Sequence, residues 1–259
     1  MFANYRYTTL LFKISVFSLF FNSFLKYLLI FLINPFFFTI LSIFDNSSCI
    51  IFLNEVFKMI KKIVASILAG FAISIGAVIY LLCSNKIFGA CFFAVGILMV
   101  MEFKFLLFTG YVPTQRAVQK WKEYFCNCGI VLVGNFIGAF ITAMLLRLTR
   151  IKDTLLPACE NVCAVKLNDN LLSIFILSIF CGIIIAAIVK ANDRKHQILY
   201  VTMLIAVFIL SSYEHVVANA FYLSFTFDIF TFDGLLFMIV CALGNLVGGI
   251  ASSYVDKIQ

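Results

Sequence analysis

His215 is the side chain of this sequence with the clearest capacity for chemistry. It lies in SSYEHVVAN (residues 211–219), a polar segment that ends an apolar run, and the ordinary pKa of an imidazole is close to neutrality. His215 could therefore give a proton to the anion of a weak acid and take it back. The alternative is a hydrogen-bonded structural histidine, but the position beside Glu214 at the end of an apolar run favours a functional role.

Four further polar residues belong with His215, and each has a functional and a structural interpretation. Thr109 could donate a hydrogen bond to an anion or to His215, or it could close its own loop. Asn219 would lie over His215 on a helical turn, or it could satisfy the interrupted backbone. Glu214 is expected to hold loop amides, because a carboxylate repels an anion. Lys166 is either a vestibule charge that attracts anions or an interfacial lysine whose ammonium reaches water.

The composition requires a membrane protein around these residues. Of the 259 residues, 64% are hydrophobic and 12% are charged, whereas about a quarter of an ordinary soluble domain is charged. The net charge of +7 indicates an excess of Lys and Arg on cytoplasmic loops and no nucleic-acid partner. No cofactor is expected, and a metal site is disfavoured because the cysteines lack paired CxxC clusters. Cys159 and Cys163 could form a disulfide only in an oxidising compartment.

Six apolar segments are expected to position the polar residues. They repeat as two triplets, each with a full span, a broken span and a full span. The third spans share a phrase, GNFIGAF (134–140) and GNLVGGI (244–250), in which glycines four residues apart allow close helix packing. The six segments cover residues 63–83, 87–101, 128–146, 171–189, 198–210 and 234–254.

The two broken spans are expected to contain the site. Because each triplet has an odd number of spans, the second is inverted relative to the first, and inverted repeats with paired broken helices are typical of transporters. Irregular backbone is tolerated in a membrane only inside protein or beside a water-filled pathway. FTGYVP (108–113), with its breakers Gly110 and Pro113, and SSYEHVVAN should therefore face each other across a pathway.

The distribution of Lys and Arg predicts the orientation. Ten of these residues lie on the side of the segment before the first span, and five lie on the opposite side. Since Lys and Arg favour cytoplasmic loops, we expect both ends of the six-span unit in the cytoplasm. The expected location is the plasma (inner) membrane, where the chain would be a multi-pass protein in contact with the lipid bilayer.

These residues resemble the formate/nitrite transporter family, which also includes hydrosulfide channels. The resemblance covers residues 60–254 and rests on three stretches: residues 93–110, GNFIGAF, and FILSSYEHVVANAF (208–221). It implies a homopentamer of aquaporin-like six-helix protomers, each with its own pore. It also implies that Thr109 and His215 form the central selectivity site, and that the vestibule lysine is Lys166. Two apolar slits would flank this site, formed by Phe93, Phe108 and Ile185 on one side and by Ile97, Leu107 and Phe208 on the other.

Two positions depart from the family pattern. The family commonly has an asparagine in the fourth span where this chain has Gly182, and a small residue where it has Lys104. Gly182 would remove a pore-lining amide, and Lys104 would place a cation near the loop. Either change could shift the choice of substrate.

The sequence therefore predicts a channel for formate, nitrite or hydrosulfide. An anion loses its hydration in an apolar slit, and burial disfavours the charged form of an acid, so passage as the protonated neutral acid is expected. Protons are then the second partner. The rival interpretations are a neutral-solute channel of aquaporin type, although the paired Asn-Pro-Ala motifs are missing, and a non-conducting accessory membrane protein. An enzyme is not expected, because no nucleophile and base accompany His215.

The start of the chain has a different composition from the rest. All 13 glycines lie at Gly70 or later, whereas residues 1–58 contain two Phe-rich apolar stretches. We expect a channel domain over residues 59–259, beginning at the MIKK sequence. Residues 1–58 would be a hydrophobic extension that is either a start-site artefact, outside the native protein, or an additional membrane segment.

Overall fold

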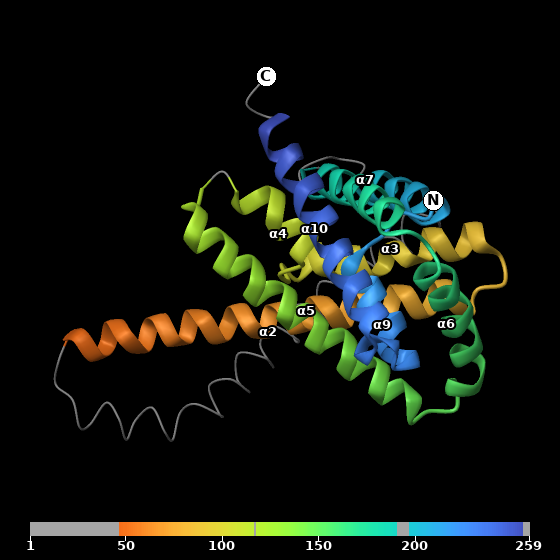
Figure 1. The fold of residues 1–259 in the computed structure, drawn as a ribbon. Coiled ribbons are helices and arrows are strands. Elements are labelled where there is room, and N and C mark those ends of the chain that lie inside the picture. The colour runs from red at the N-terminus through yellow and green to blue at the C-terminus, as the bar shows by residue number, and fades with distance from the viewer. Residues whose placement is uncertain (1–46, 117, 191–196, 256–259) are drawn as a thin grey trace, which may run out of the picture. The chain divides into compact units, whose positions relative to one another are not determined.

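The structure is a computed structural model that describes residues 47–116, 118–190 and 197–255, and every regular element in these residues is a helix. The expected all-α class is therefore confirmed for this part of the chain. Figure 1 shows the order of the elements. They are α2 (Ser47–Leu82), α3 (Lys86–Glu102), α4 (Phe108–Gln115), α5 (Trp121–Arg147), α6 (Lys152–Leu167), α7 (Leu171–Lys190), α8 (Gln197–Leu210), α9 (Val216–Thr226), the 3₁₀ turn η1 (Asp228–Phe230) and α10 (Phe232–Val255).

The chain divides into two units, residues 1–60 and 61–259. Of the first unit the structure describes only the start of α2, where Lys58 and Glu55 form an ion pair of 2.7 Å. Residues 1–46 lie outside the described residues. The division into an extension over 1–58 and a channel domain over 59–259 therefore stays a prediction. The site lies entirely in the second unit.

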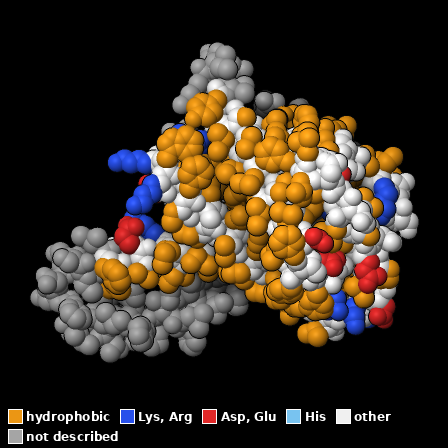
Figure 2. Space-filling view, viewed as in Figure 1, with side chains coloured by type: hydrophobic (Ala, Val, Ile, Leu, Met, Phe, Trp, Pro, Cys, Tyr) orange, Lys and Arg blue, Asp and Glu red, His pale blue; other side chains and the backbone are white. Residues whose placement is uncertain are grey.

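In the part of the chain that the structure describes, four helices are long and apolar enough to cross a membrane: α2, α5, α7 and α10. Helices α3 and α8 have 17 and 14 residues, so they extend about 25 Å and 21 Å, less than the roughly 30 Å of a bilayer core. In Figure 2 apolar side chains cover the middle of the face that is shown, as expected where a surface meets lipid. A multi-pass membrane protein is therefore confirmed, with two of its apolar segments too short to span alone.

Each short helix is followed by a brief break and a second helix. Helix α4 begins at Phe108, and α9 begins at Val216. The prediction of irregular backbone through FTGYVP and SSYEHVVAN was thus wrong for most of these residues, because only 103–107 and 211–215 leave helical geometry. Gly110 and Pro113 lie within α4, and Gly110 serves as a packing residue: a Cβ there would lie 3.2 Å from a methyl group of Val189 on α7.

The two breaks are made by the same hydrogen-bonded turn. In the first, Lys104 adopts a left-handed conformation, and the N–H of Phe105 donates to the carbonyl of Val100. In the second, Ser212 is left-handed, and the N–H of Tyr213 donates to the carbonyl of Phe208. This is the Schellman arrangement, which normally has glycine at the left-handed position. Since neither break has glycine there, the sequence gives no local sign of the turn.

Glycines allow the long helices to approach closely. A Cβ on Gly138 of α5 would overlap the carbonyl oxygen of Ile67 on α2, and a Cβ on Gly248 of α10 would overlap that of Ile179 on α7. The packing role predicted for the two GN phrases is therefore confirmed. Gly182 has the same role, because its Cβ would lie 2.5 Å from the carbonyl oxygen of Asn245. Position 182 thus faces α10, and it lines neither of the two cavities described below.

Helix α6 has no counterpart among the predicted segments, although it forms a wall of the site. It follows α5 and precedes α7 in the chain, and it packs against α9. It contains no long apolar run, because charged and polar residues interrupt its sequence KDTLLPACENVCAVKL. One face is nevertheless buried, by Leu155, Cys159 and Cys163 at helical spacing. Both cysteines are free thiols.

Candidate functional site

A buried asparagine holds the first break. The side-chain oxygen of Asn135 on α5 accepts a hydrogen bond of 2.8 Å from the N–H of Phe108, the first residue of α4. Its amide nitrogen donates to the carbonyls of Ser66, at 2.7 Å, and Leu106, at 2.8 Å. A helix that begins inside a protein has N–H groups without intrahelical partners. Asn135 therefore supplies a partner that water would supply at a surface.

A second asparagine holds the second break in the same way. The side-chain oxygen of Asn245 on α10 accepts a hydrogen bond of 3.0 Å from the N–H of Val216, where α9 begins. Its amide nitrogen donates to the carbonyls of Ser178 and Glu214, both at 2.8 Å. Sequence analysis did not name Asn135 or Asn245 as site residues, although GNFIGAF contains the first and GNLVGGI contains the second. The signal was an amide side chain repeated at one place in two apolar helices.

A hydrogen bond between Thr109 and His215 connects the segments that meet at the two breaks. Their Oγ1 and Nε2 atoms are 2.9 Å apart, and both residues are buried. The other ring nitrogen of His215, Nδ1, accepts a hydrogen bond of 3.2 Å from the N–H of Ala218 and so caps α9. Nδ1 therefore carries no proton, and the ring proton lies on Nε2, toward Thr109. The hydroxyl proton of Thr109 is then available to another acceptor.

Both residues also lie where helices begin. Thr109 is in the first turn of α4, and His215 is the N-cap of α9. The N-terminus of a helix carries a partial positive charge, which favours an anion and disfavours an imidazolium. The neutral tautomer given by the hydrogen bonds agrees with this electrostatic setting.

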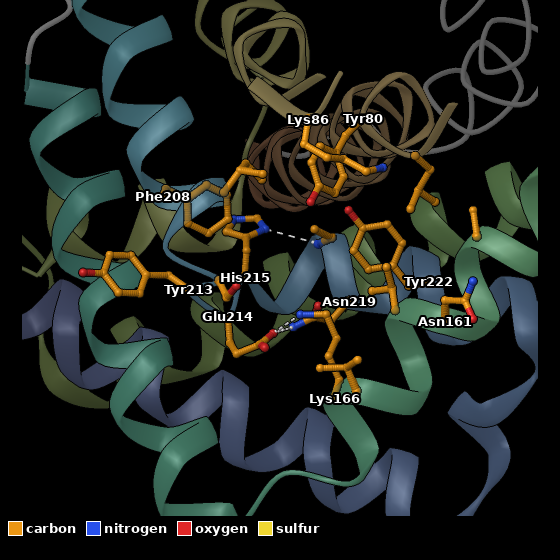
Figure 3. A pocket seen from close by; sticks show the side chains of 17 residues that line it. Tyr80, Lys86, Asn161, Lys166, Phe208, Tyr213, Glu214, His215, Asn219 and Tyr222 are labelled. Atoms are coloured by element: carbon orange, nitrogen blue, oxygen red, sulfur yellow. Dashed lines mark hydrogen bonds and ion pairs between the residues drawn. The ribbon is translucent and has the colours of Figure 1, made fainter. Parts of the chain in front are cut away.

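A cavity of about 410 Å³ lies on one side of His215. It is called the first cavity, and Figure 3 shows it from close by. The His215 ring lies beside Phe208, at 6.0 Å between ring centres, while Glu214 points away from it toward Lys166 and Asn219. The labelled residues of its wall are Tyr80, Lys86, Asn161, Lys166, Phe208, Tyr213, Glu214, His215, Asn219 and Tyr222.

Glu214 and Lys166 neutralise each other in this cavity. The Lys166 ammonium is 2.5 Å from the Glu214 carboxylate, and both side chains are largely buried. The same carboxylate oxygen accepts a hydrogen bond of 2.8 Å from the side chain of Asn219. Glu214 therefore binds two side chains and not the loop amides that were expected. Asn219 directs its side chain to Glu214, and only its backbone N–H contacts His215, at 3.0 Å from the carbonyl oxygen.

A second cavity, of about 230 Å³, is lined by other residues. It is bounded by both ends of the first break and by α7, and it shares no lining residue with the first cavity. Lys104 is in its wall, so the cation expected near the loop is found there. The lining residues are Ile97, Val100, Met101, Lys104, Phe105, Leu106, Leu107, Gly110, Tyr111, Thr114, Gln115, Ile185 and Val189.

The apolar side chains proposed as slits are all buried, but they group differently from the expectation. Ile97, Leu107 and Ile185 line the second cavity together. Phe208 lines the first cavity and contacts the Phe93 ring, at 6.2 Å between centres. Ile185 thus lies with Ile97, and Phe93 lies with Phe208. The remaining residue of the set, Phe108, is buried and lines neither cavity.

The described residues offer no place for a metal. Across residues 47–116, 118–190 and 197–255 no group of three His, Cys, Asp or Glu side chains is arranged to hold an ion. Thr109 and His215 offer hydrogen bonding and the proton that the imidazole carries.

Comparisons with known proteins agree with this architecture. A sequence model described as formate/nitrite transporter matches residues 54–255. The uncharacterized transporter YrhG of Bacillus subtilis (strain 168) is 29% identical over 186 residues, which cover 64% of this chain and 68% of that protein. The structure of a pentameric formate channel with formate bound has a TM-score of 0.66 at 22% identity, over 78% of this chain and 96% of that one. An ion channel of the FNT family has a TM-score of 0.64 at 17% identity, over 79% and 90%.

Proposed function

The chain belongs to the formate/nitrite transporter family, and on that basis we propose that it conducts small monovalent anions of weak acids: formate, nitrite or hydrosulfide. The family and the structural neighbours are channels and transporters, not enzymes. The observation that carries the proposal is the hydrogen bond between Thr109 and His215, which joins two helix N-termini beside a cavity. One of the structural neighbours is a channel with formate bound.

The anion would cross as the neutral acid. Buried apolar side chains lie beside the polar groups, among them Ile97, Leu107 and Phe208, and burial there would remove the water that stabilises a charge. Burial also raises the proton affinity of a weak acid, so protonation removes most of the cost. His215 would relay the proton or hold the anion by donating from Nε2, and the free hydroxyl proton of Thr109 would be the second donor. The first cavity would receive the anion near Lys166, whose charge Glu214 reduces.

Six spans in two inverted triplets are the architecture that we propose for the membrane unit. Each broken span would pair a short helix with the helix after the break: α3 with α4, and α8 with α9. The matching hydrogen bonds of Asn135 and Asn245 support the repeat, because each asparagine binds two backbone groups at its break and one carbonyl of a long helix, that of Ser66 or Ser178. We further propose a homopentamer in the plasma (inner) membrane with both ends of the six-span unit in the cytoplasm. The pentameric neighbour and the excess of Lys and Arg support this assignment.

Flux through His215 variants tests the proposal. The purified full chain would be placed in proteoliposomes, and formate, nitrite and hydrosulfide flux would be measured at two pH values. His215→Asn is informative, because asparagine can still cap α9 through its side-chain oxygen but cannot take up a proton at these pH values. We expect it to fold and to lose about tenfold or more of the flux together with its pH dependence. Full pH-dependent flux in His215→Asn and His215→Ala would refute the role of the histidine.

The unmodified chain serves as the control in the same vesicles. Absence of anion flux from an intact pentamer would favour the non-conducting accessory protein. Rapid water permeation without anion flux, measured by stopped-flow light scattering, would favour the neutral-solute channel. Neither result depends on the variants, so a failure of the whole proposal is separable from a wrong role for His215.

A further inference from the structure

The second cavity contains a lysine whose charge is not neutralised. Lys104 lines this cavity, and no residue that the structure describes lies within hydrogen-bond or ion-pair distance of its ammonium. The lysines of the first cavity are engaged. Lys166 is 2.5 Å from Glu214, and Lys86 lies over the ring of Tyr80, at 4.9 Å from its centre. An anion in the second cavity would therefore meet this positive charge with no carboxylate among the residues that line the cavity.

Lys104 occupies this place in a strained backbone conformation. Its φ of 55° is left-handed, which costs a non-glycine residue free energy that glycine would not lose. The equivalent turn of the other break has Ser212 with a φ of 56°, and Ser212 lines the first cavity. The turn thus places one of its residues in the wall of each cavity. Strain that persists at a cavity wall is a sign of function, and here the strained residue is the cation.

Gln115 supplies a second group that can hold an anion. It lies at the end of α4 and lines the same cavity as Lys104. Its side-chain oxygen accepts a hydrogen bond of 3.2 Å from Gln119, which fixes its amide, and the amide N–H groups of Gln115 have no acceptor among the described residues. Amide N–H and ammonium groups are donors to carboxylate oxygens. The two donors lie in the wall that also contains the apolar residues Leu107 and Ile185.

We infer that Lys104 and Gln115 form a subsite for a small monovalent anion in the second cavity, beside its apolar residues Ile97, Leu107 and Ile185. This inference rests on the proposed function and assigns two of its residues. The subsite raises the local concentration of the anion beside the apolar residues of the cavity. The bound anion would then be protonated and would enter the apolar part of the path as the neutral acid. Because the charge is partly exposed, its effect is electrostatic and is weakened by salt.

The test measures the concentration dependence of formate flux from each side. Proteoliposomes would contain the full chain in a determined orientation. Labelling of Lys104→Cys by a membrane-impermeant maleimide, located by peptide mass spectrometry, would show to which side the second cavity opens. For Lys104→Gln we expect the half-saturating formate concentration to rise about twofold to fivefold from that side only. Raising the salt concentration should weaken wild-type binding toward the Lys104→Gln value, and Gln115→Leu should give a smaller rise.

Three controls separate charge from structure. Lys104→Arg should restore the wild-type value, because it keeps the charge. Lys104→Gly should behave like Lys104→Gln, because it keeps the left-handed turn and removes only the cation. Lys122→Gln removes an exposed lysine outside the cavity and should change nothing. Equal half-saturation in Lys104→Gln and wild type, an equal loss from both sides, or an equal effect of Lys122→Gln would overturn the inference. Wild-type protein without formate flux would instead refute the proposed function.

Discussion

Replacing Asn245 by leucine tests the anchor that holds α9 in place. Asn245 is fully buried and makes three hydrogen bonds to backbone groups of two other segments. The carbonyl of Ser178 lies within a helix and keeps its intrahelical partner. The N–H of Val216 loses its acceptor, and the carbonyl of Glu214 keeps only a weak contact of 3.5 Å with the thiol of Cys241. Two buried groups are therefore left without a good partner.

The magnitude follows from these two groups. Each unsatisfied buried group costs about 1–3 kcal/mol, so the expected loss is about 2–6 kcal/mol. For a chain of this size that corresponds to a fall in Tm of roughly 5–20 °C. Asn168→Leu is the matched control, because Asn168 is exposed and its side chain makes one hydrogen bond, of 2.8 Å, to Ala164.

Thermal melting of the purified protein in detergent, followed by size-exclusion chromatography of heated samples, measures the difference. We expect Asn245→Leu to melt at least 5 °C below Asn168→Leu, in line with the estimate of the unsatisfied groups. Formate flux should also fall, since His215 lies next to the freed N–H. If the two variants had the same Tm, the breaks would not depend on asparagine anchors, and the account of why α9 starts at Val216 would be refuted.

Two further experiments test the packing and the thiols. Gly138→Ala places a methyl group against the carbonyl oxygen of Ile67, so we expect a lower Tm, whereas Gly129→Ala has no atom within 4 Å and should be neutral; equal melting would contradict close packing of α2 and α5. Burial raises the pKa of the Cys163 thiol to about 11, and the thiolate is the reactive form, so Cys163 should be alkylated at least about tenfold more slowly at pH 7 than the exposed Cys126, and faster as the pH rises. Equal labelling of both thiols, resolved by peptide mass spectrometry, would show that α6 does not bury its cysteines.

Much of the helical framework could be predicted, because several helices begin and end where an apolar run of the sequence begins and ends. The segment expected over 171–189 is α7, and that expected over 198–210 is α8, each within one residue. Helix α5 begins at Trp121 and not at Cys128, because its first turns contain polar residues that continue a helix without being apolar. Periodicity and hydropathy thus locate the part of a helix that faces lipid and miss the turns beyond it.

The contacts within the site were harder to predict, because they depend on distant segments. The hydrogen bond between Thr109 and His215 joins residues 106 positions apart and was named as a possibility, since both lie at interrupted spans. The pair of Lys166 and Glu214 could not be derived, because Lys166 is positioned by α6, a helix without an apolar signal. Glu214 changes the electrostatics of the first cavity, because it pairs with Lys166, which was expected to be an unpaired cation.

The two breaks share one backbone design but differ in chemistry. The residue before each resumed helix is Leu107 in the first break and His215 in the second, although both precede an N–H held by an asparagine. The left-handed residues differ in the same way, with Lys104 in the first break and Ser212 in the second. A repeated backbone needs only the anchors and the turn, so the other positions are free to diverge. The first break thus has an apolar side chain and a cation, and the second has a proton-carrying ring. The proposed path from a bound anion to a neutral acid would need this asymmetry.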